Sequence, residues 1–326
     1  MRYKNFSFVK CNLENNINYY MLSILLNKAE EISNNLCSLV PNEIRNVVVC
    51  EIIFSIKGEI QSYNFFEARI KSHKRMTYAQ VDKFLTTGSG LERNISSSLK
   101  SLQILTKILL KIRNKRGALE IEGQEPLLDI DAEGRVKKIV LPKRLFSHQM
   151  VEEAMLAANV CAANFMNKNY NFGVYRIHEE PDELKLESLK NFFSLKGFAG
   201  SFSKDPANLI KQCLLHSKDQ KLSKVLQTVV LQSLKRAEYS TEELGHFGLQ
   251  LERYSHFTSP IRRYPDLMTH RMIKNILSNT SNEVNKDNTE EICIEMSELE
   301  RVAEKSSRQV TQQMICFYLK KYVGEE

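Results

Sequence analysis

The apolar residues of this chain change their spacing repeatedly, and that irregular order restricts the folds open to it. Residues 47–55 alternate in a strand-like pattern, and the turn at Lys57-Gly58 leads to a predicted partner strand over residues 60–70. Residues 91–115 instead carry apolar side chains at helical spacing, and the basic stretch before Gly117 is typical of a helix C-terminus. Strands and helices therefore follow one another without a regular period.

The remaining patterns extend this prediction along the chain. They predict helices over residues 78–86, 147–168, 182–196, 205–216 and 219–236, and strands over residues 118–141, 174–178 and 249–254. Ser259-Pro260 predicts another helix start, with a break or restart near Tyr264 because Pro265 follows. We therefore predict an α+β fold, one large domain with a mixed β-sheet, surrounding helices and a long C-terminal helix. Its expected parts are a divergent segment 1–32, a main body 33–278, a polar linker 279–289 and a terminal helix 290–326.

Composition narrows the classes of function. The 326 residues include 46 Lys and Arg against 39 Asp and Glu, a net charge of +7 that permits a nucleic-acid partner without requiring one. No apolar run approaches the ~18 residues of a membrane span, and the first 30 residues lack a signal-peptide pattern. The seven cysteines are scattered and form no CxxC pair, which is typical of buried thiols in a reducing compartment. We expect a soluble cytoplasmic protein with no membrane partner.

Glycine-loop, dinucleotide, zincin and hydrolase-elbow motifs are absent, and residues 245–271 carry most of the chemical information. These 27 residues, GHFGLQLERYSHFTSPIRRYPDLMTHR, contain three histidines, four arginines, four aromatic residues and two prolines. Arg262 and Arg263 follow a proline-fixed turn, where each guanidinium group can bind two oxygens of a phosphate. Four rings could stack on single-stranded bases: Tyr254, His256, Phe257 and Tyr264. The alternative is structural, with Arg262 paired to Asp266 and the aromatic rings in the core.

This segment resembles the signature of the ribonuclease II / ribonuclease R family, whose RNB domain degrades RNA from the 3′ end. The Arg-Arg-Tyr-Pro-Asp form of the motif is more similar to the ribonuclease R branch. Other segments agree in the same order along the chain: residues 33–39, 72–81, 116–120, 131–139, 148–165 and 174–186. The similarity runs from about residue 33 to about residue 323, so it covers most of the chain.

The resemblance implies a processive 3′→5′ exoribonuclease that hydrolyses single-stranded RNA to nucleoside 5′-monophosphates. It assigns Arg262 as the catalytic residue that contacts phosphate near the cleavage point. It places Glu152 and Tyr78 in the pocket for the 3′ end, although on their own they fit a solvent-facing helix residue and a core aromatic. Tyr19 falls at the position of a base-stacking tyrosine, but its neighbours do not match the family. The RNA-binding candidates are thus Arg263, Glu152, Tyr78, Tyr19, Tyr264 and His256.

The family's cofactor is Mg²⁺, held by an aspartate-rich run, and this chain departs from that pattern. Residues 1–32 contain Glu14, Glu30 and Glu31 but no aspartate. Asp129 and Asp131 would share one face of a strand, yet the corresponding family stretch is an ordinary hairpin. We therefore assign no metal ligands in this chain. Two further family residues, a stacking phenylalanine and a glutamate that partners the phosphate arginine, fall on Ile121 and Ser307.

Three interpretations remain open. The resemblance implies a partial RNB domain, cut at both sides and without the cold-shock and S1 modules that flank it in the family. The chain is then an exoribonuclease by descent that is inactive alone, or a degenerate remnant that only binds RNA. The third interpretation is the C-terminal half of a split exoribonuclease, with a separately encoded N-terminal fragment as its partner.

Overall fold

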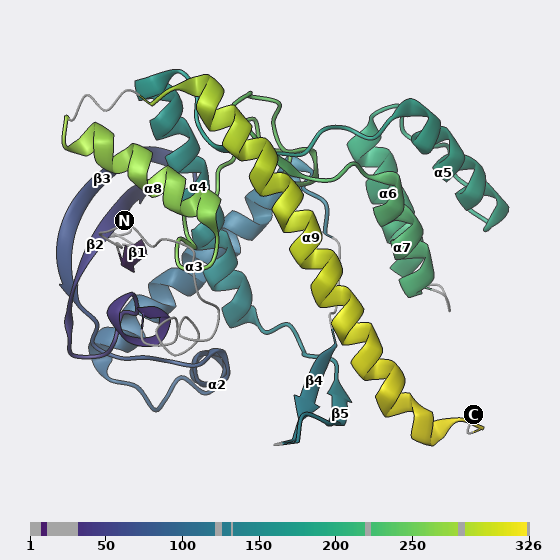
Figure 1. Ribbon diagram of the computed structural model, residues 1–326, viewed down its shortest axis with the longest axis horizontal. Coiled ribbons are helices and arrows are strands. Elements are labelled where there is room, and N and C mark those ends of the chain that lie inside the picture. Colours follow the sequence, from purple (N-terminus) through teal and green to yellow (C-terminus); the bar gives the residue numbers. More distant parts are fainter. Residues whose placement is uncertain are drawn as a thin grey trace.

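The computed structural model describes residues 8–11, 32–120, 126–131, 133–218, 223–279 and 284–324, and the statements below concern these ranges. Helices and strands alternate irregularly along them (Figure 1). The strands are β1 (Phe8–Cys11), β2 (Ile44–Phe54), β3 (Ile60–Lys71), β4 (Leu127–Ile130), β5 (Val136–Val140), β6 (Tyr175–Ile177) and β7 (Glu238–Ser240). The α-helices are α2 (Tyr78–Thr87), α3 (Arg93–Arg116), α4 (Phe146–Tyr170), α5 (Glu183–Leu195), α6 (Pro206–Lys218), α7 (Ser223–Ser233), α8 (Tyr264–Leu277) and α9 (Lys286–Leu319). Short helical turns are η1 (Ile32–Leu36), η2 (Phe247–Leu249) and η3 (Lys320–Tyr322).

The α+β class is confirmed, but the strands of the described ranges form three small antiparallel sheets in place of one mixed sheet. The largest has the order β1-β2-β3, in which β2 and β3 form the hairpin predicted around Lys57-Gly58. Gly58 has φ +84°, and a Cβ atom there would lie 2.6 Å from Ile108 and 2.7 Å from Ile112 of α3. Glycine is therefore required by both the turn and the close packing on α3.

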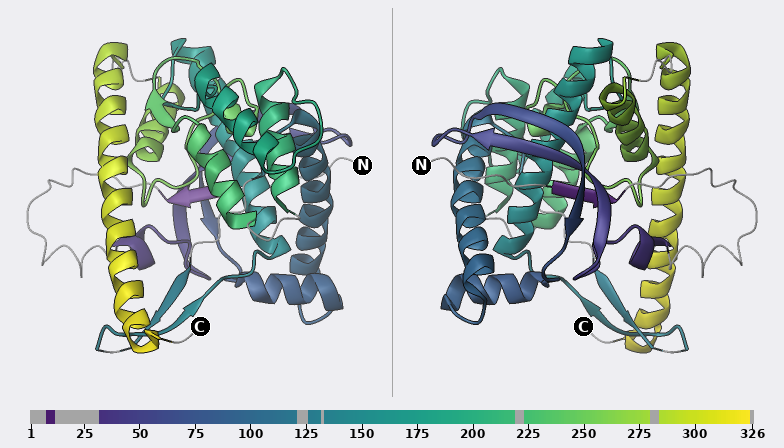
Figure 2. Two further views of the ribbon diagram at one scale, coloured as in Figure 1. Left: turned by 90° about the vertical axis from the view of Figure 1, so that its right-hand side faces the viewer. Right: turned by 90° about the vertical axis from the view of Figure 1, so that its left-hand side faces the viewer.

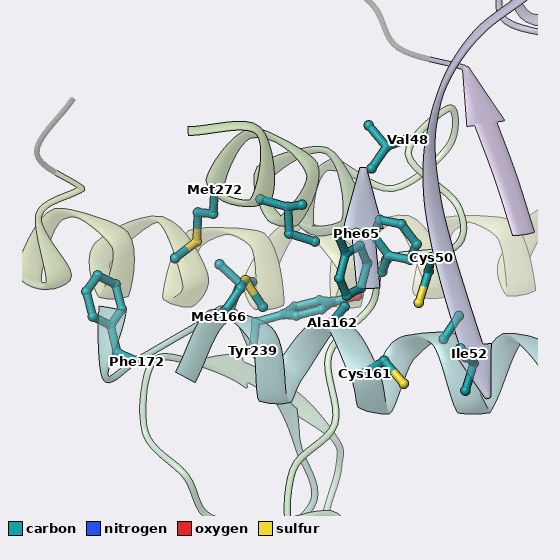
Figure 3. Packing of buried hydrophobic residues seen from close by; sticks show 14 of the residues in the cluster. Val48, Cys50, Ile52, Phe65, Cys161, Ala162, Met166, Phe172, Tyr239 and Met272 are labelled. Atoms are coloured by element: carbon teal, nitrogen blue, oxygen red, sulfur yellow. The ribbon is translucent and has the colours of Figure 1, made fainter. Parts of the chain in front are cut away.

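The main core lies between this hairpin and α4, with α8 and α9 completing it (Figure 3). Ala158, Cys161, Ala162 and Met166 of α4 are fully buried, and three of these four side chains are small. Small side chains let the sheet approach the helix closely. Phe65 of β3 fills the space between them, with its ring 4.8 Å from Phe165 and 5.4 Å from Phe257, centre to centre.

A second group of buried residues holds α5, α6 and α7 together. It includes Leu189, Phe193, Ile210 and Val230, all at most 2% exposed. Figure 1 shows these three helices on one side of α9, with the β2–β3 hairpin on the other. In Figure 2 they face the viewer in the left picture and the hairpin does so in the right one. The C-terminal part of α9 continues past helices α5, α6 and α7 to the β4–β5 hairpin.

Three of the differences from the sequence prediction have a clear physical reason. The strand predicted over residues 249–254 is wrong, because Gln250 has φ +53° and the chain folds back so that Leu251 bonds to His246. Ser259-Pro260 does not start a helix, since the helix begins after the turn, at Tyr264, with Pro265 in its first turn. The terminal helix begins at Lys286 and not at residue 290, because the Asn285 side chain accepts a hydrogen bond from the Asn288 N–H and caps it.

Among the helices of these ranges, none is both long enough and apolar enough to cross a membrane.

Replacing Phe65 with Ala tests the main core. Phe65 is 2% exposed, and removing its ring should lower the free energy of unfolding by about 3–5 kcal/mol because a cavity remains among the neighbouring rings. Phe66, the next residue on β3, points to the other face and is 36% exposed. Phe66→Ala should therefore cost about 1 kcal/mol or less. Urea denaturation followed by circular dichroism measures both, and equal losses would contradict this description of the core.

Candidate nucleic-acid interface

Two neighbouring arginines in the turn before α8, Arg262 and Arg263, differ in their side-chain partners. The Ser259 carbonyl accepts hydrogen bonds from the N–H groups of Arg262 and Arg263, at 3.2 and 3.1 Å. Asp266, which is fully buried, accepts from the Ser259 N–H and from Arg263 Nη2, the latter at 2.9 Å. Arg263, not Arg262, therefore forms the ion pair with Asp266 that the structural alternative had assigned to Arg262. Arg262 is exposed and makes no side-chain hydrogen bond or ion pair with any residue of the described ranges.

The segment leading into this turn is held by a buried amide of α4. Asn159 is 2% exposed, and its Oδ1 accepts hydrogen bonds from the N–H groups of Phe257 and Thr258, at 3.0 and 3.2 Å. Its Nδ2 donates to the hydroxyl of Tyr254 at 3.0 Å. These bonds satisfy backbone groups that no strand pairs with, so the segment is fixed without belonging to a sheet.

His256 lies half-buried among aromatic rings. Its Nδ1 is 2.9 Å from the hydroxyl of Tyr239, and the rings of Tyr239 and Tyr254 contact it edge-on. Burial, with the nearby charges of Arg263 and Arg176, lowers the pKa of His256 to about 2. The imidazole is therefore uncharged at neutral pH and supplies no positive charge to a phosphate. Its contact with RNA stays a prediction.

The aromatic residues of the motif divide between core and surface. Tyr254 is 8% exposed and Phe257 is 2% exposed, so both belong to the core. Tyr264 is 41% exposed, and the guanidinium of Arg271 lies 5.9 Å from its ring centre. Of the four rings considered for stacking, Tyr264 is thus the one open to solvent.

Glu152 and Tyr78 come together where the N-terminal ends of α2 and α4 meet. The Ser147 hydroxyl donates to the Tyr78 carbonyl at 2.9 Å, and the Tyr78 ring stacks on His148 with 4.0 Å between ring centres. Tyr78 is 45% exposed and therefore is not a core residue. The stack leaves an aromatic surface beside the carboxylate of Glu152, which follows His148 by one helical turn.

Two arginines hold the carboxylate of Glu152. Arg113 Nη1 lies 2.6 Å from Glu152 Oε1 and 2.8 Å from Glu153 Oε1, and Arg144 donates to Glu152 Oε2. Burial acts to raise the pKa of Glu152, but the two guanidinium groups outweigh it and the pKa is lowered. For Glu153 burial prevails over Arg113, and its pKa is raised. Glu152 is therefore ionised and oriented, unlike the solvent-facing helix residue of the alternative interpretation.

The residues around Glu152 and the segment held by Asn159 lie against one face of α4. Glu152 and Asn159 are seven residues apart, which is almost two full helical turns. The axial distance between them is about 10 Å, from the rise of ~1.5 Å per residue. The carboxylate site and the segment that carries Arg262 are therefore neighbours along a single rigid helix.

The described ranges contain no group of three or more Asp, Glu, His or Cys residues that could hold a metal ion. Two carboxylates of the site are paired with arginine, Asp266 with Arg263 and Glu152 with Arg113 and Arg144. Asp131 accepts from Arg135 and closes the β4–β5 turn, as expected for an ordinary hairpin.

Some sequence assignments cannot be located, and some site residues were missed. Tyr19 and Ile121 lie outside the described residues. Sequence analysis did not identify Arg113, Arg144 or Asn159. Asn159 could have been noticed as a lone amide in an alanine-rich helix, whereas nothing in the sequence pairs Arg113 with a residue 39 positions later.

Comparisons with known proteins agree on one family. A family model described as the RNB domain matches residues 16–279. Ribonuclease R of Vibrio parahaemolyticus is 35% identical over 328 residues, which cover 94% of this chain and 39% of that protein. Ribonuclease R of Escherichia coli is 34% identical over 323 residues, covering 94% of this chain and 40% of that protein. The chain thus spans about two fifths of the length of these curated relatives.

Solved structures agree with the sequence relatives. RNase R of Mycoplasma genitalium, in complex with ribose methylated single-stranded RNA, superposes with a TM-score of 0.82 at 29% identity. The match covers 90% of this chain and 47% of that one. Yeast Ssd1, a pseudonuclease, has a TM-score of 0.63 at 19% identity over 82% of this chain and 34% of that one, a likeness of fold alone.

Replacing Arg113 with Met tests the arrangement around Glu152. The change leaves Glu153, whose side chain is 6% exposed, without its ion-pair partner, and should lower the free energy of unfolding by about 3–5 kcal/mol. Arg144→Met is the matched control, because the Arg144–Glu152 pair is far more exposed and should cost about 1 kcal/mol or less. Urea denaturation distinguishes them, and an Arg113→Met variant as stable as Arg144→Met would refute the buried ion pair.

Proposed function

This chain belongs to the RNB domain family, and on that premise we propose that it binds single-stranded RNA in the manner of ribonuclease R. The reaction to which its site belongs is 3′→5′ exoribonucleolytic hydrolysis, which releases nucleoside 5′-monophosphates. The Mycoplasma genitalium relative with single-stranded RNA supports this choice of ligand. The cytoplasmic location and a separately encoded partner fragment stay predictions from the sequence.

One observation carries the proposal: Arg262 is an exposed arginine with no partner among the described residues, on a turn whose backbone is fixed. Asp266 and Ser259 hold the turn, and Asn159 holds the segment before it. The fixed backbone places this guanidinium group at the surface, where it can bind two phosphate oxygens at once. Arg263 supports the turn through its ion pair with Asp266, and its contact with RNA stays a prediction from the sequence.

Glu152 and Tyr78 would receive the 3′-terminal nucleotide. Each oxygen of the Glu152 carboxylate already accepts one hydrogen bond, and a carboxylate has about four acceptor positions. The remaining positions can accept from ribose hydroxyl groups. The exposed Tyr78 ring, backed by His148, offers a surface on which a base can stack.

A second function, RNA binding without hydrolysis, is favoured by the state of the carboxylates. Asp266 and Glu152 are paired with arginine, and no group of three or more Asp, Glu, His or Cys residues in the described ranges could hold a metal ion. We therefore expect the chain by itself to bind RNA more readily than it cleaves it. The two functions differ in one measurable property, the release of mononucleotides.

Arg262→Ala should weaken binding of a fluorescently labelled single-stranded RNA dodecamer by about tenfold, because one charge-assisted phosphate contact is lost. The slope of log affinity against log salt concentration should fall by about one unit. Arg135→Ala is the control, since Arg135 is 74% exposed but lies on the β4–β5 turn, paired with Asp131. Fluorescence anisotropy measures both variants at several salt concentrations. Equal affinities for the two variants would refute the role of Arg262.

The same samples, incubated with Mg²⁺ and a 3′-tailed RNA, separate the two functions. We expect RNA binding with no sustained release of nucleoside 5′-monophosphates. Sustained release that is lost in Arg262→Ala would instead establish hydrolysis by this chain, with metal ligands outside the described residues.

A further inference from the structure

A pocket of about 650 Å³ lies between the turn that carries Arg262 and the helix α9. Pockets of ~300–1,000 Å³ are typical of small-ligand sites. The turn contributes Arg262, Arg263, Tyr264 and Pro265 to its lining. The wall from α9 consists of Ile292, Glu295, Met296, Leu299, Glu300 and Ala303, with Tyr239 between the two walls.

The charged groups of this pocket fall into two kinds. Arg263 is paired with Asp266, and Glu300 accepts from Arg176 Nη1 at 2.6 Å. Arg262 and Glu295, in contrast, are exposed and make no hydrogen bond or ion pair with any residue in the described ranges. One open positive group and one open negative group thus belong to opposite walls.

The surface between these two charges is apolar and partly aromatic. Tyr239 is 4% exposed and Met296 is 7% exposed, and they form its inner part. The guanidinium of Arg176 lies 4.5 Å from the Tyr239 ring centre and fixes that ring in place. Toward solvent, Leu299 is 59% exposed and Tyr264 is 41% exposed. A flat apolar ligand could cover both and remove apolar area from water.

We propose that this pocket is a base subsite for the nucleotide whose phosphate binds Arg262, and that it selects bases with an exocyclic amino group. The inference rests on the proposed function, because it requires RNA at Arg262. The phosphate belongs at the turn, since Glu295 would repel it from the α9 wall. The base then lies against Leu299 and Tyr264, with its polar edge toward Glu295.

The chemistry of Glu295 defines the preferred bases. A carboxylate accepts hydrogen bonds and cannot donate them when ionised. Adenine, cytosine and guanine each present an amino group to such an acceptor, as in the contact of Glu or Asp with cytosine N4. Uracil has no amino group, and its single ring N–H lies between two carbonyl oxygens that a carboxylate repels. The subsite should therefore discriminate against uracil.

The test compares labelled oligocytidylate and oligouridylate dodecamers on the full 326-residue chain by fluorescence anisotropy. Glu295→Gln should lower the ratio of cytidylate to uridylate affinity by about three- to tenfold, because the amide loses the negative charge that favours the cytosine amino group and can donate to a uracil carbonyl. Glu291→Gln is the matched control: it removes the same charge one turn earlier on α9, outside the pocket lining. The measured quantity is the change in the ratio, which cancels the different stacking of the two free strands.

The outcomes separate this inference from the proposed function. If Arg262→Ala weakens both oligonucleotides while Glu295→Gln leaves their ratio as in Glu291→Gln, the base subsite is overturned and RNA binding at Arg262 stands. If Arg262→Ala affects neither oligonucleotide, both proposals fall. Both glutamates are exposed, so thermal unfolding should be unchanged in the two variants, and a change in the ratio then reports on binding.

Discussion

The hydrogen bonds of the Asn159 amide are the constraint on which the candidate site depends. Residues 254–259 run beside α4 without forming a strand, so their backbone groups need partners from elsewhere. Asn159 supplies two acceptor bonds to that backbone and one donor bond to Tyr254. Phe257 then enters the main core against Phe65, and the turn that follows is presented at the surface. Polar bonding and apolar packing thus fix the same short segment from two directions.

Arginine has two distinct functions in this fold. Arg113, Arg176 and Arg263 are largely buried, and each is paired with a carboxylate, which offsets part of the cost of burying the guanidinium group. Arg262 is exposed and has no such bond among the described residues. Its neighbour's ion pair keeps Asp266 from competing for it. The Arg262 guanidinium group therefore stays unpaired within the described ranges because Asp266 is already bound to Arg263.

Local patterns were sufficient to predict much of the fold. The β2–β3 hairpin, α3 with its cap at Gly117, and α4 were predicted because periodic apolar residues and a turn glycine define them locally. The strand over residues 249–254 failed because Gln250 adopts a left-handed conformation and Leu251 bonds back to His246, which apolar spacing does not reveal. Asp266 is reachable from both Arg262 and Arg263 on a helix start, so sequence spacing could not choose between them. The ion pairs of Arg113 and Arg144 with Glu152 join three separate segments of the chain, so no local sequence pattern predicts them.

The shared face of α4 has a consequence for how this family can vary. Glu152 and Asn159 face the same way only because seven residues separate them, and each added or deleted residue would turn one of them by about 100° around the helix axis. A single side-chain substitution on α4 leaves the angle between positions 152 and 159 around the helix axis unchanged. A change in length between these two residues cannot be absorbed in the same way, because it would uncouple the Glu152 carboxylate from the segment that carries Arg262. The number of residues in this stretch is therefore a structural constraint on the site in its own right, in addition to the packing of the buried α4 side chains.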